Sequence, residues 1–281
     1  MLNRDKWDSH TLRLMTGSLL LLPLLALLSV GPYWSWLVVV ALVACAGLWE
    51  FERLIFDENG LPPWWQAFYV LAGLLLPLGA ALGGVAGLHG MLVLSLFGGL
   101  CCLLAFSPLD LAQLDRLARL CLGWLYIPYL LSYVLLIGRM ETGRAWMFFI
   151  LVVIVASDAG AYYCGKRFGR HKLYEAVSPK KTIEGSAGGL LASIILGSAF
   201  GLLFLGETSL GCIVVFSGVL ALVSQVGDLI ESMIKRMSGK KDASQLLPGH
   251  GGILEDKEQS WLGVRCIKGL RPVLKAIGNP R

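Results

Sequence analysis

The sequence predicts an all-α fold, a polytopic membrane helix bundle of about eight transmembrane helices. The composition is far from that of a soluble domain, because 56% of the 281 residues are hydrophobic and only 15% are charged. Apolar runs recur at about 17 to 25 residues, the length that crosses a bilayer. The basic residues are also asymmetric: with the amino terminus inside, all 24 Lys and Arg residues except Arg139 and Arg144 fall on the inner side.

The apolar runs define the elements in order. Their count is even and their basic loops lie inside, so we expect a multi-pass protein of the inner (cytoplasmic) membrane with both termini in the cytoplasm. Closely spaced glycines within these runs are typical of tight helix packing. The eight runs are 13–30, 33–50, 67–88, 90–106, 120–137, 145–163, 187–205 and 209–229, and the glycines are Gly79, Gly83, Gly84, Gly87, Gly188 and Gly189.

Polar chemistry is concentrated in the second half of the chain. We therefore expect residues 1–144 to be a scaffold of membrane helices, 145–260 to be the catalytic membrane region, and 261–281 to be a basic tail. The net charge of +5 is placed on inner loops, where anionic lipid is the usual partner, so we expect membrane lipids and no nucleic acid as partners. The seven cysteines form no CxxC pair and lie mostly in apolar runs, which favours small buried hydrophobes.

Asp158 is the first candidate site residue, near the inner end of the run 145–163. A carboxylate at such a depth normally faces a protein interior, a water-filled cavity or a cation. Tyr162 follows at i+4, on the same helical face. A purely structural pairing of Asp158 with a basic residue is the alternative.

The basic loop that follows has features of a phosphate site. Lys166 lies between glycines that let a backbone approach an anion, although basic loops beside membranes are common. Ser178 followed by proline predicts a helix start. Lys180, Lys181 and Thr182 would then lie in its first turn, where free amides and the helix dipole favour an anion.

The stretch QVGDLIESMIKRM places charges on one face of the last apolar run. Asp228, Glu231 and Lys235 recur at helical spacing. A Glu231–Lys235 ion pair accounts for two of them and leaves Asp228 without an explanation.

Further carboxylates follow in the carboxy-terminal segment, which contains the turn-rich sequence PGHGG. Oxygen ligands beside many cations are what Mg²⁺ prefers when it also binds phosphates, so Asp228, Asp242, Glu255 and Asp256 are candidate ligands. His250 is either a general acid/base or a structural residue. Acidic metal ligands and phosphate-binding cations together favour phosphoryl or nucleotidyl transfer.

The segments SDAGAYYCGKRFGRHKLYEAVSPKKTIEG and QVGDLIES, followed by KR, KKD and PGHGG, resemble the bacterial phosphatidate cytidylyltransferases, also called CDP-diacylglycerol synthases. The resemblance implies the reaction of CTP with phosphatidate to give CDP-diacylglycerol and pyrophosphate, with Mg²⁺ and with a second metal ion left open. Together with this resemblance, we expect catalytic roles for Asp158, Asp228, Lys235 and Asp242. The resemblance implies substrate-binding roles for Tyr162, Ser178, Lys180, Lys181, Thr182, Glu184, Arg236 and Lys241, and the local sequence adds Lys166 and His250 to the expected substrate-binding residues. A homodimer through glycine-rich faces is also expected.

The chain departs from this family after PGHGG. The family continues with a D-R-x-D-S motif and a closing apolar span, whereas this sequence reads ILEDKEQSW and then the basic segment 261–281, so we expect the closing span to be missing. A Glu in place of Asp is one methylene longer and shifts a bound metal. A weak or inactive relative that only binds CTP or lipid is therefore an alternative to an active enzyme. A transporter with intramembrane carboxylates and a CTP-dependent lipid kinase are further alternatives.

Overall fold

The computed structural model describes residues 23, 25–56, 61–106, 110–206 and 208–238. Contacts divide the chain into two units, one ending at Leu135 and the other spanning Leu136–Met237 in the described residues. Six helices of this described part are long and apolar enough to cross a membrane. The predicted class, an all-α polytopic membrane helix bundle, is confirmed.

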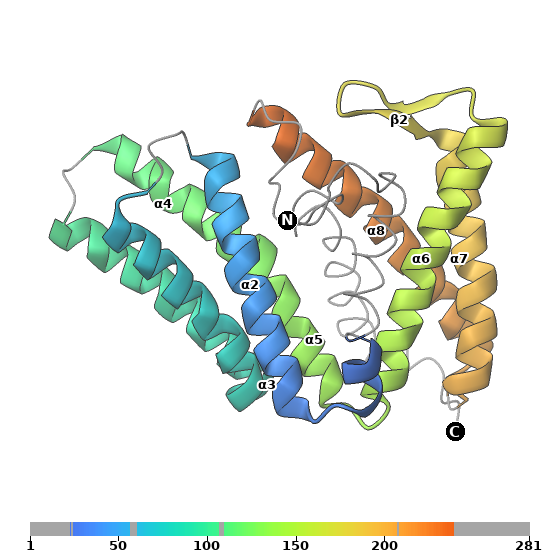
Figure 1. The fold of residues 1–281 in the computed structure, drawn as a ribbon, viewed down its shortest axis with the longest axis horizontal. Coiled ribbons are helices and arrows are strands. Elements are labelled where there is room, and N and C mark those ends of the chain that lie inside the picture. Colours follow the sequence, from blue (N-terminus) through green and yellow to red (C-terminus); the bar gives the residue numbers. More distant parts are fainter. Residues whose placement is uncertain (1–22, 24, 57–60, 107–109, 207, 239–281) are drawn as a thin grey trace, which may run out of the picture. The chain divides into compact units, whose positions relative to one another are not determined.

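The first unit consists of helices joined by short connections (Figure 1). A π-helical turn at Pro128 joins two of these helices, so the predicted span 120–137 lies within one continuous helical stretch. Of the predicted span 13–30, residues 25–30 are described and helical, and most of the rest lies outside the described residues. The elements are α2 (Tyr33–Ile55), α3 (Pro63–Phe106), α4 (Leu111–Trp124), η2 (Leu125–Tyr129) and α5 (Leu130–Gly138), whose last residues belong to the second unit.

Helix α3 contains two predicted spans, 67–88 and 90–106, and its break lies within the first of them and not at the predicted boundary. The break is at Gly84, whose φ of 63° and ψ of −140° suit glycine and few other residues. The two halves then run past each other, since the backbones of Gly79 and Gly87 are in contact. Ser95 Oγ also donates to the carbonyl of Ala72 at 3.0 Å. Close packing at Gly79 and Gly87 therefore follows the prediction, whereas Gly84 serves the bend.

Aromatic side chains form the core of the first unit. Trp65, Tyr69 and Trp124 are fully buried. Trp124 Nε1 donates to the carbonyl of Tyr69 at 2.9 Å, which fixes α4 against α3. Glu52 is buried at the end of α2, where its carboxylate accepts from Gln66 Nε2 at 2.9 Å.

The second unit places a short β-hairpin between two long helices. The strands are antiparallel, with Lys172 opposite Thr182, and the hairpin projects at one end of α6 and α7 (Figure 1). The elements are α6 (Gly143–Phe168), β1 (Lys172–Tyr174), β2 (Ser178–Thr182), α7 (Ile183–Phe204) and α8 (Leu210–Met237).

The predicted helix start at Ser178 is wrong. Residues Ser178–Thr182 form β2, and α7 begins at Ile183 with Thr182 as its N-cap. The Thr182 hydroxyl accepts from the amide of Gly185 at 3.1 Å, which satisfies one of the unpaired donors of the first turn. Pairing with β1 keeps the preceding residues extended, and a local Ser-Pro signal does not outweigh that pairing.

Glycines bring α6 and α7 together. A Cβ on Gly160 would lie 2.7 Å from the carbonyl oxygen of Gly188 and 3.0 Å from the Cα of Gly189. Ser193 Oγ donates across the same interface to the carbonyl of Val153 at 2.8 Å. The predicted packing role of Gly188 and Gly189 is confirmed.

We predict that Gly160→Leu separates α6 from α7, because the new side chain meets backbone that cannot move aside. The free energy of unfolding should fall by about 1–3 kcal/mol. The measurement is thermal unfolding of the purified protein in detergent. Gly211→Leu is the matched control, since a Cβ at Gly211 meets nothing within 4 Å. Equal unfolding temperatures for the two variants would contradict the prediction.

Candidate functional site

A cavity of about 470 Å³ lies within the second unit. Its walls come from the C-terminal halves of α6 and α8, from the two hairpin strands, and from the first turn of α7, so segments about 70 residues apart in sequence share one space. Its polar and glycine lining residues are Ser157, Asp158, Tyr162, Gly165, Lys166, Lys180, Lys181, Thr182, Gly185, Ser186, Gln225 and Asp228, and Ala161 and Leu173 complete it.

Two carboxylates face this cavity from different helices. Asp158 belongs to α6 and Asp228 to α8, and they are close enough for their charges to repel. The Oδ2 atom of Asp228 accepts from Lys181 Nζ at 2.7 Å, in an ion pair whose side chains are 18% and 31% exposed. Within the described residues, Oδ1 of Asp228 is buried and has no hydrogen-bond partner. Asp228 therefore has one occupied and one unoccupied acceptor oxygen.

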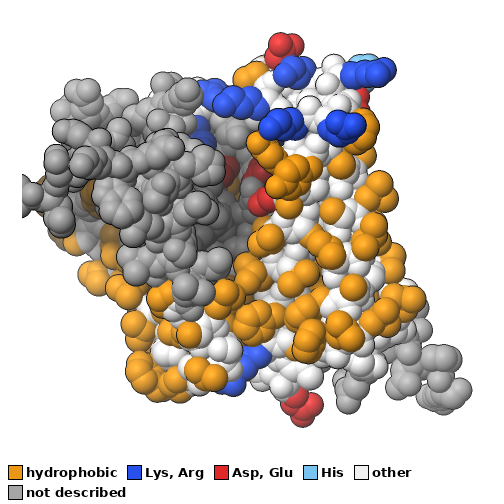
Figure 2. Space-filling view, turned by 45° about the vertical axis from the view of Figure 1, so that its right-hand side comes forward, with side chains coloured by type: hydrophobic (Ala, Val, Ile, Leu, Met, Phe, Trp, Pro, Cys, Tyr) orange, Lys and Arg blue, Asp and Glu red, His pale blue; other side chains and the backbone are white. Residues whose placement is uncertain are grey.

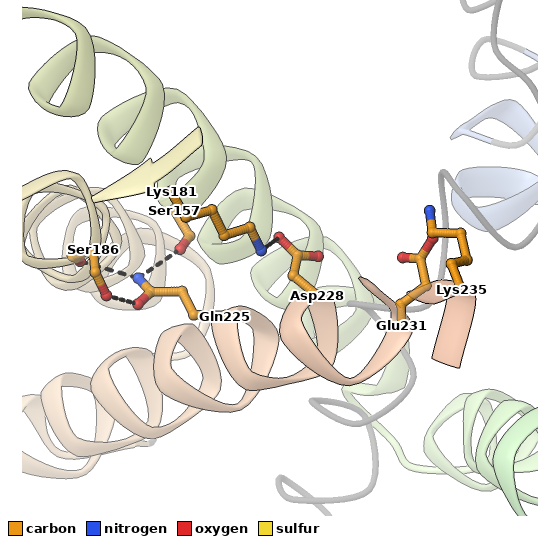
Figure 3. A network of polar contacts seen from close by, with 7 residues as sticks. All are labelled: Ser157, Lys181, Ser186, Gln225, Asp228, Glu231 and Lys235. Atoms are coloured by element: carbon orange, nitrogen blue, oxygen red, sulfur yellow. Dashed lines mark hydrogen bonds and ion pairs between the residues drawn. The ribbon is translucent and has the colours of Figure 1, made fainter. Parts of the chain in front are cut away.

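Gln225 joins the three helices beneath the carboxylates. Its Nε2 donates to the carbonyl of Ser186 at 3.0 Å and to Ser157 Oγ at 3.4 Å, and Ser186 Oγ donates to Gln225 Oε1. Figure 3 shows Gln225 between Ser157 and Ser186, one turn of α8 away from the Asp228–Lys181 pair. The hydrogen bonds of Gln225 thus fix the position of α8 along its axis, and with it the position of Asp228.

Three lysines of the cavity, Lys166, Lys180 and Lys181, belong to the basic end of the unit. In Figure 2, Lys and Arg side chains gather around the hairpin end, and hydrophobic side chains cover the flanks of the helices below it. A helix flank of this kind faces lipid, and basic side chains at its end face the polar boundary. The exposed basic residues there are Lys166, Arg167, Arg170, Lys172 and Lys180.

Glu184 forms hydrogen bonds with other residues of the protein. Its carboxylate accepts from the backbone amides of Arg170 and His171 at 3.1 and 3.2 Å, and it contacts His171 Nδ1 at 2.7 Å. These bonds tie the end of α6 to the start of α7. Substrate binding by Glu184 stays a prediction, and its described contacts hold the loop in front of the hairpin.

Most of the expected site residues that the structure describes converge on the cavity. Asp158, Tyr162, Lys166, Lys180, Lys181, Thr182 and Asp228 all line it.

Four other expected site residues do not line the cavity, and Glu184 is one of them. Ser178 opens β2, Lys235 pairs with Glu231 at 2.7 Å further along α8 (Figure 3), and Arg236 Nε donates to the carbonyl of Val177 at 3.4 Å. Lys241, Asp242, His250, Glu255 and Asp256 lie outside the described residues.

The residues present fit a divalent cation in part. Among the described residues no three acidic, histidine or cysteine side chains come together. Two carboxylates nevertheless face one cavity, and one of them has a buried oxygen without a hydrogen-bond donor, which is costly unless a ligand satisfies it. Hard oxygen donors of this kind suit Mg²⁺ with room left for substrate oxygens.

Sequence reasoning missed Gln225, Ser157 and Ser186. They are uncharged, and their importance depends on which helix faces meet. A usable signal was present, because Gln225 and Asp228 stand at i and i+3 on one helical face and Ser157 directly precedes Asp158.

The fold defines a multi-pass membrane protein, and its cavity of carboxylates and lysines is suited to ligands that carry phosphate groups. Comparison with known families makes the assignment specific. The model of the cytidylyltransferase family matches residues 11–258, and the chain belongs to this family.

Several bacterial phosphatidate cytidylyltransferases are similar to the chain. The protein of Mycobacterium bovis is 31% identical over 242 residues, which are 78% of this chain and 74% of the relative. The Bacillus subtilis protein is 36% identical over 151 residues, 53% of this chain and 56% of the relative. The Haemophilus influenzae protein is 40% identical over 117 residues, covering 40% and 41%. In the last two comparisons the match spans about half of each relative.

We predict that Gln225→Leu loosens the junction of α6, α7 and α8. The change keeps the side-chain size and removes three hydrogen bonds, leaving the Ser157 and Ser186 groups without this partner. The free energy of unfolding should fall by about 1–3 kcal/mol. Thermal unfolding in detergent measures it. Gln113→Leu is the matched control, because the described hydrogen bond of the Gln113 side chain is with Arg116 on its own helix. An equal effect in the control would refute the assignment.

Proposed function

We propose that this chain is a phosphatidate cytidylyltransferase that converts CTP and phosphatidate to CDP-diacylglycerol and pyrophosphate. The observation that carries the proposal is the single cavity in which Asp158 and Asp228 face Lys180 and Lys181. Membership of the cytidylyltransferase family and the names of the relatives supply the substrates.

In the proposed reaction, an oxygen of the phosphatidate phosphate attacks the α-phosphorus of CTP. The bond from that phosphorus to the oxygen bridging the β-phosphate breaks, and pyrophosphate leaves with the bond electrons. The attacking phosphate is already anionic, so little proton transfer is needed and positioning dominates. Lys166, Lys180 and Lys181 line the cavity and would neutralise the phosphate oxygens.

Asp228 and Asp158 would hold Mg²⁺, with the unpartnered Oδ1 of Asp228 as one ligand. Asp242, Glu255 and Asp256 stay predicted ligands, and a second ion stays a prediction. A bound Mg²⁺ neutralises charge on the reacting phosphates. The two carboxylates would hold it beside the lysines that line the same cavity.

We further propose that the cavity opens at the cytoplasmic face of the inner membrane, with both termini cytoplasmic. The basic end of the second unit supports this orientation through the positive-inside rule. CTP would enter from the cytoplasm, and the lipid would enter sideways from the leaflet. A homodimer stays a prediction from the glycine-rich helix faces.

We predict that Asp228→Asn lowers the rate of CDP-diacylglycerol formation on the order of 100-fold or more, because the variant lacks the charge that holds the metal. The purified protein in detergent is incubated with CTP, phosphatidate and Mg²⁺, and both products are quantified. Asp115→Asn is the matched control, since Asp115 forms an exposed ion pair with Arg119 in the first unit.

This assay, together with CTP binding and transport in reconstituted vesicles, gives a different result for each alternative. An inactive relative binds CTP without product, and a lipid kinase releases CDP in place of pyrophosphate. A transporter moves substrate across reconstituted vesicles without chemistry. Full activity in Asp228→Asn with an intact fold would refute the role of Asp228.

A further inference from the structure

The Lys181–Asp228 ion pair occupies a position that the proposed function needs for something else. Asp228 is the carboxylate best placed for a divalent cation, yet one of its oxygens is bound to an ammonium group at 2.7 Å. The other oxygen is buried without a hydrogen-bond partner in the described residues. The carboxylate is thus held by a cation of this chain and is only half satisfied.

Lys181 has a fixed backbone and a movable side chain. Its residue belongs to β2, and the next residue both pairs with Lys172 and caps α7, so the main chain is held from two sides. The side chain reaches from the strand down to α8 (Figure 3) and is 31% exposed within the cavity. A lysine side chain has four rotatable bonds, so the ammonium can leave Asp228 for another anion in the same cavity while β2 stays in place.

Electrostatics makes the two cations compete. An ammonium group and a divalent ion on one carboxylate would repel each other at short range, and Asp158 is the other carboxylate that lines this cavity. A nucleoside triphosphate reverses this balance because it supplies several negative charges at once. The metal can then take Asp228 while the ammonium takes a phosphate oxygen.

We propose that Lys181 is a stand-in cation: it neutralises Asp228 before ligands bind, and it transfers to a substrate phosphate when the divalent ion arrives with the nucleotide. The proposal rests on the proposed function and adds a coupling to it. The nucleotide draws the Lys181 ammonium away from Asp228, and the metal takes its place on Asp228 and frees the ammonium for a phosphate. Each ligand therefore tightens the binding of the other by the same factor. Lys181 is then a positioning residue for the metal and a contact for the nucleotide.

The first test measures Mn²⁺ binding without nucleotide, by electron paramagnetic resonance of the full chain in detergent. Lys181→Met removes the competing cation and should tighten Mn²⁺ binding at least about fivefold. Lys180→Met is the matched control, because it removes the same charge from the same cavity, and no contact between Lys180 and a carboxylate is described. Lys181→Arg keeps a cation and should bind Mn²⁺ as the unmodified protein does. If Lys181→Met does not fold, Lys181→Gln replaces it.

The second test measures CTP binding by calorimetry in the presence of EDTA. Asp228→Asn releases Lys181 and should tighten metal-free CTP binding at least about fivefold, although it abolishes Mn²⁺ binding. Asp158→Asn removes the same charge from the cavity without breaking the ion pair, and it should have a smaller effect.

The outcomes separate this inference from the proposed function. Equal Mn²⁺ affinities in Lys181→Met and Lys180→Met, or equal CTP affinities in the two aspartate variants, overturn the inference and leave the enzyme assignment intact. Unmodified protein that binds neither Mn²⁺ nor CTP overturns both. Mn²⁺ binding that persists in Asp228→Asn removes Asp228 from the metal site and overturns the inference with it.

Discussion

The geometry of the second unit depends on satisfying polar groups where three helices meet. The flanks of α6, α7 and α8 are apolar, so a polar side chain between them must find partners within the protein. Gln225 does this with its donor and its acceptor, reaching Ser157 on α6 and Ser186 on α7. An amide so constrained allows one axial position of α8, which sets where Asp228 meets Lys181. The candidate site therefore depends on a junction made of uncharged side chains.

Small side chains make this junction possible. Serine hydroxyls are short, and they reach Gln225 only because α6 and α7 approach to the distance that Gly160 and Gly189 permit. Larger residues would keep the helices apart and leave the amide unsatisfied, at the cost of its desolvation. The close approach of α6 and α7 and the hydrogen bonds of Gln225 consequently depend on each other.

The parts of this arrangement that sequence reveals are those with strong local signals. Asp158 and Asp228 stand out because carboxylates in apolar runs are costly, and helical spacing links Tyr162 to the first of them. Gln225 gives no such signal, since its role depends on three helices meeting. The predicted start of α7 is wrong for a related reason. Ser-Pro at 178–179 is a common signal for a helix start, but pairing of β2 with β1 outweighs this local signal. Local patterns thus predict the helices and the charged residues that line the cavity, whereas tertiary pairing decides the start of α7 and the role of Gln225.

The strand at residues 178–182 has a chemical consequence that a helix would not have had. Successive side chains of a strand point to opposite sides, whereas in a helix Lys180 and Lys181 would lie about 100° apart. In the structure Lys181 is half-buried and reaches Asp228, while Lys180 is exposed on the same cavity rim. Two adjacent lysines of one cavity thereby differ in environment: Lys181 is paired with Asp228, and Lys180 is exposed to solvent. This division fits the role proposed for Lys181, because Lys181 is paired with Asp228 while no contact between Lys180 and a carboxylate is described.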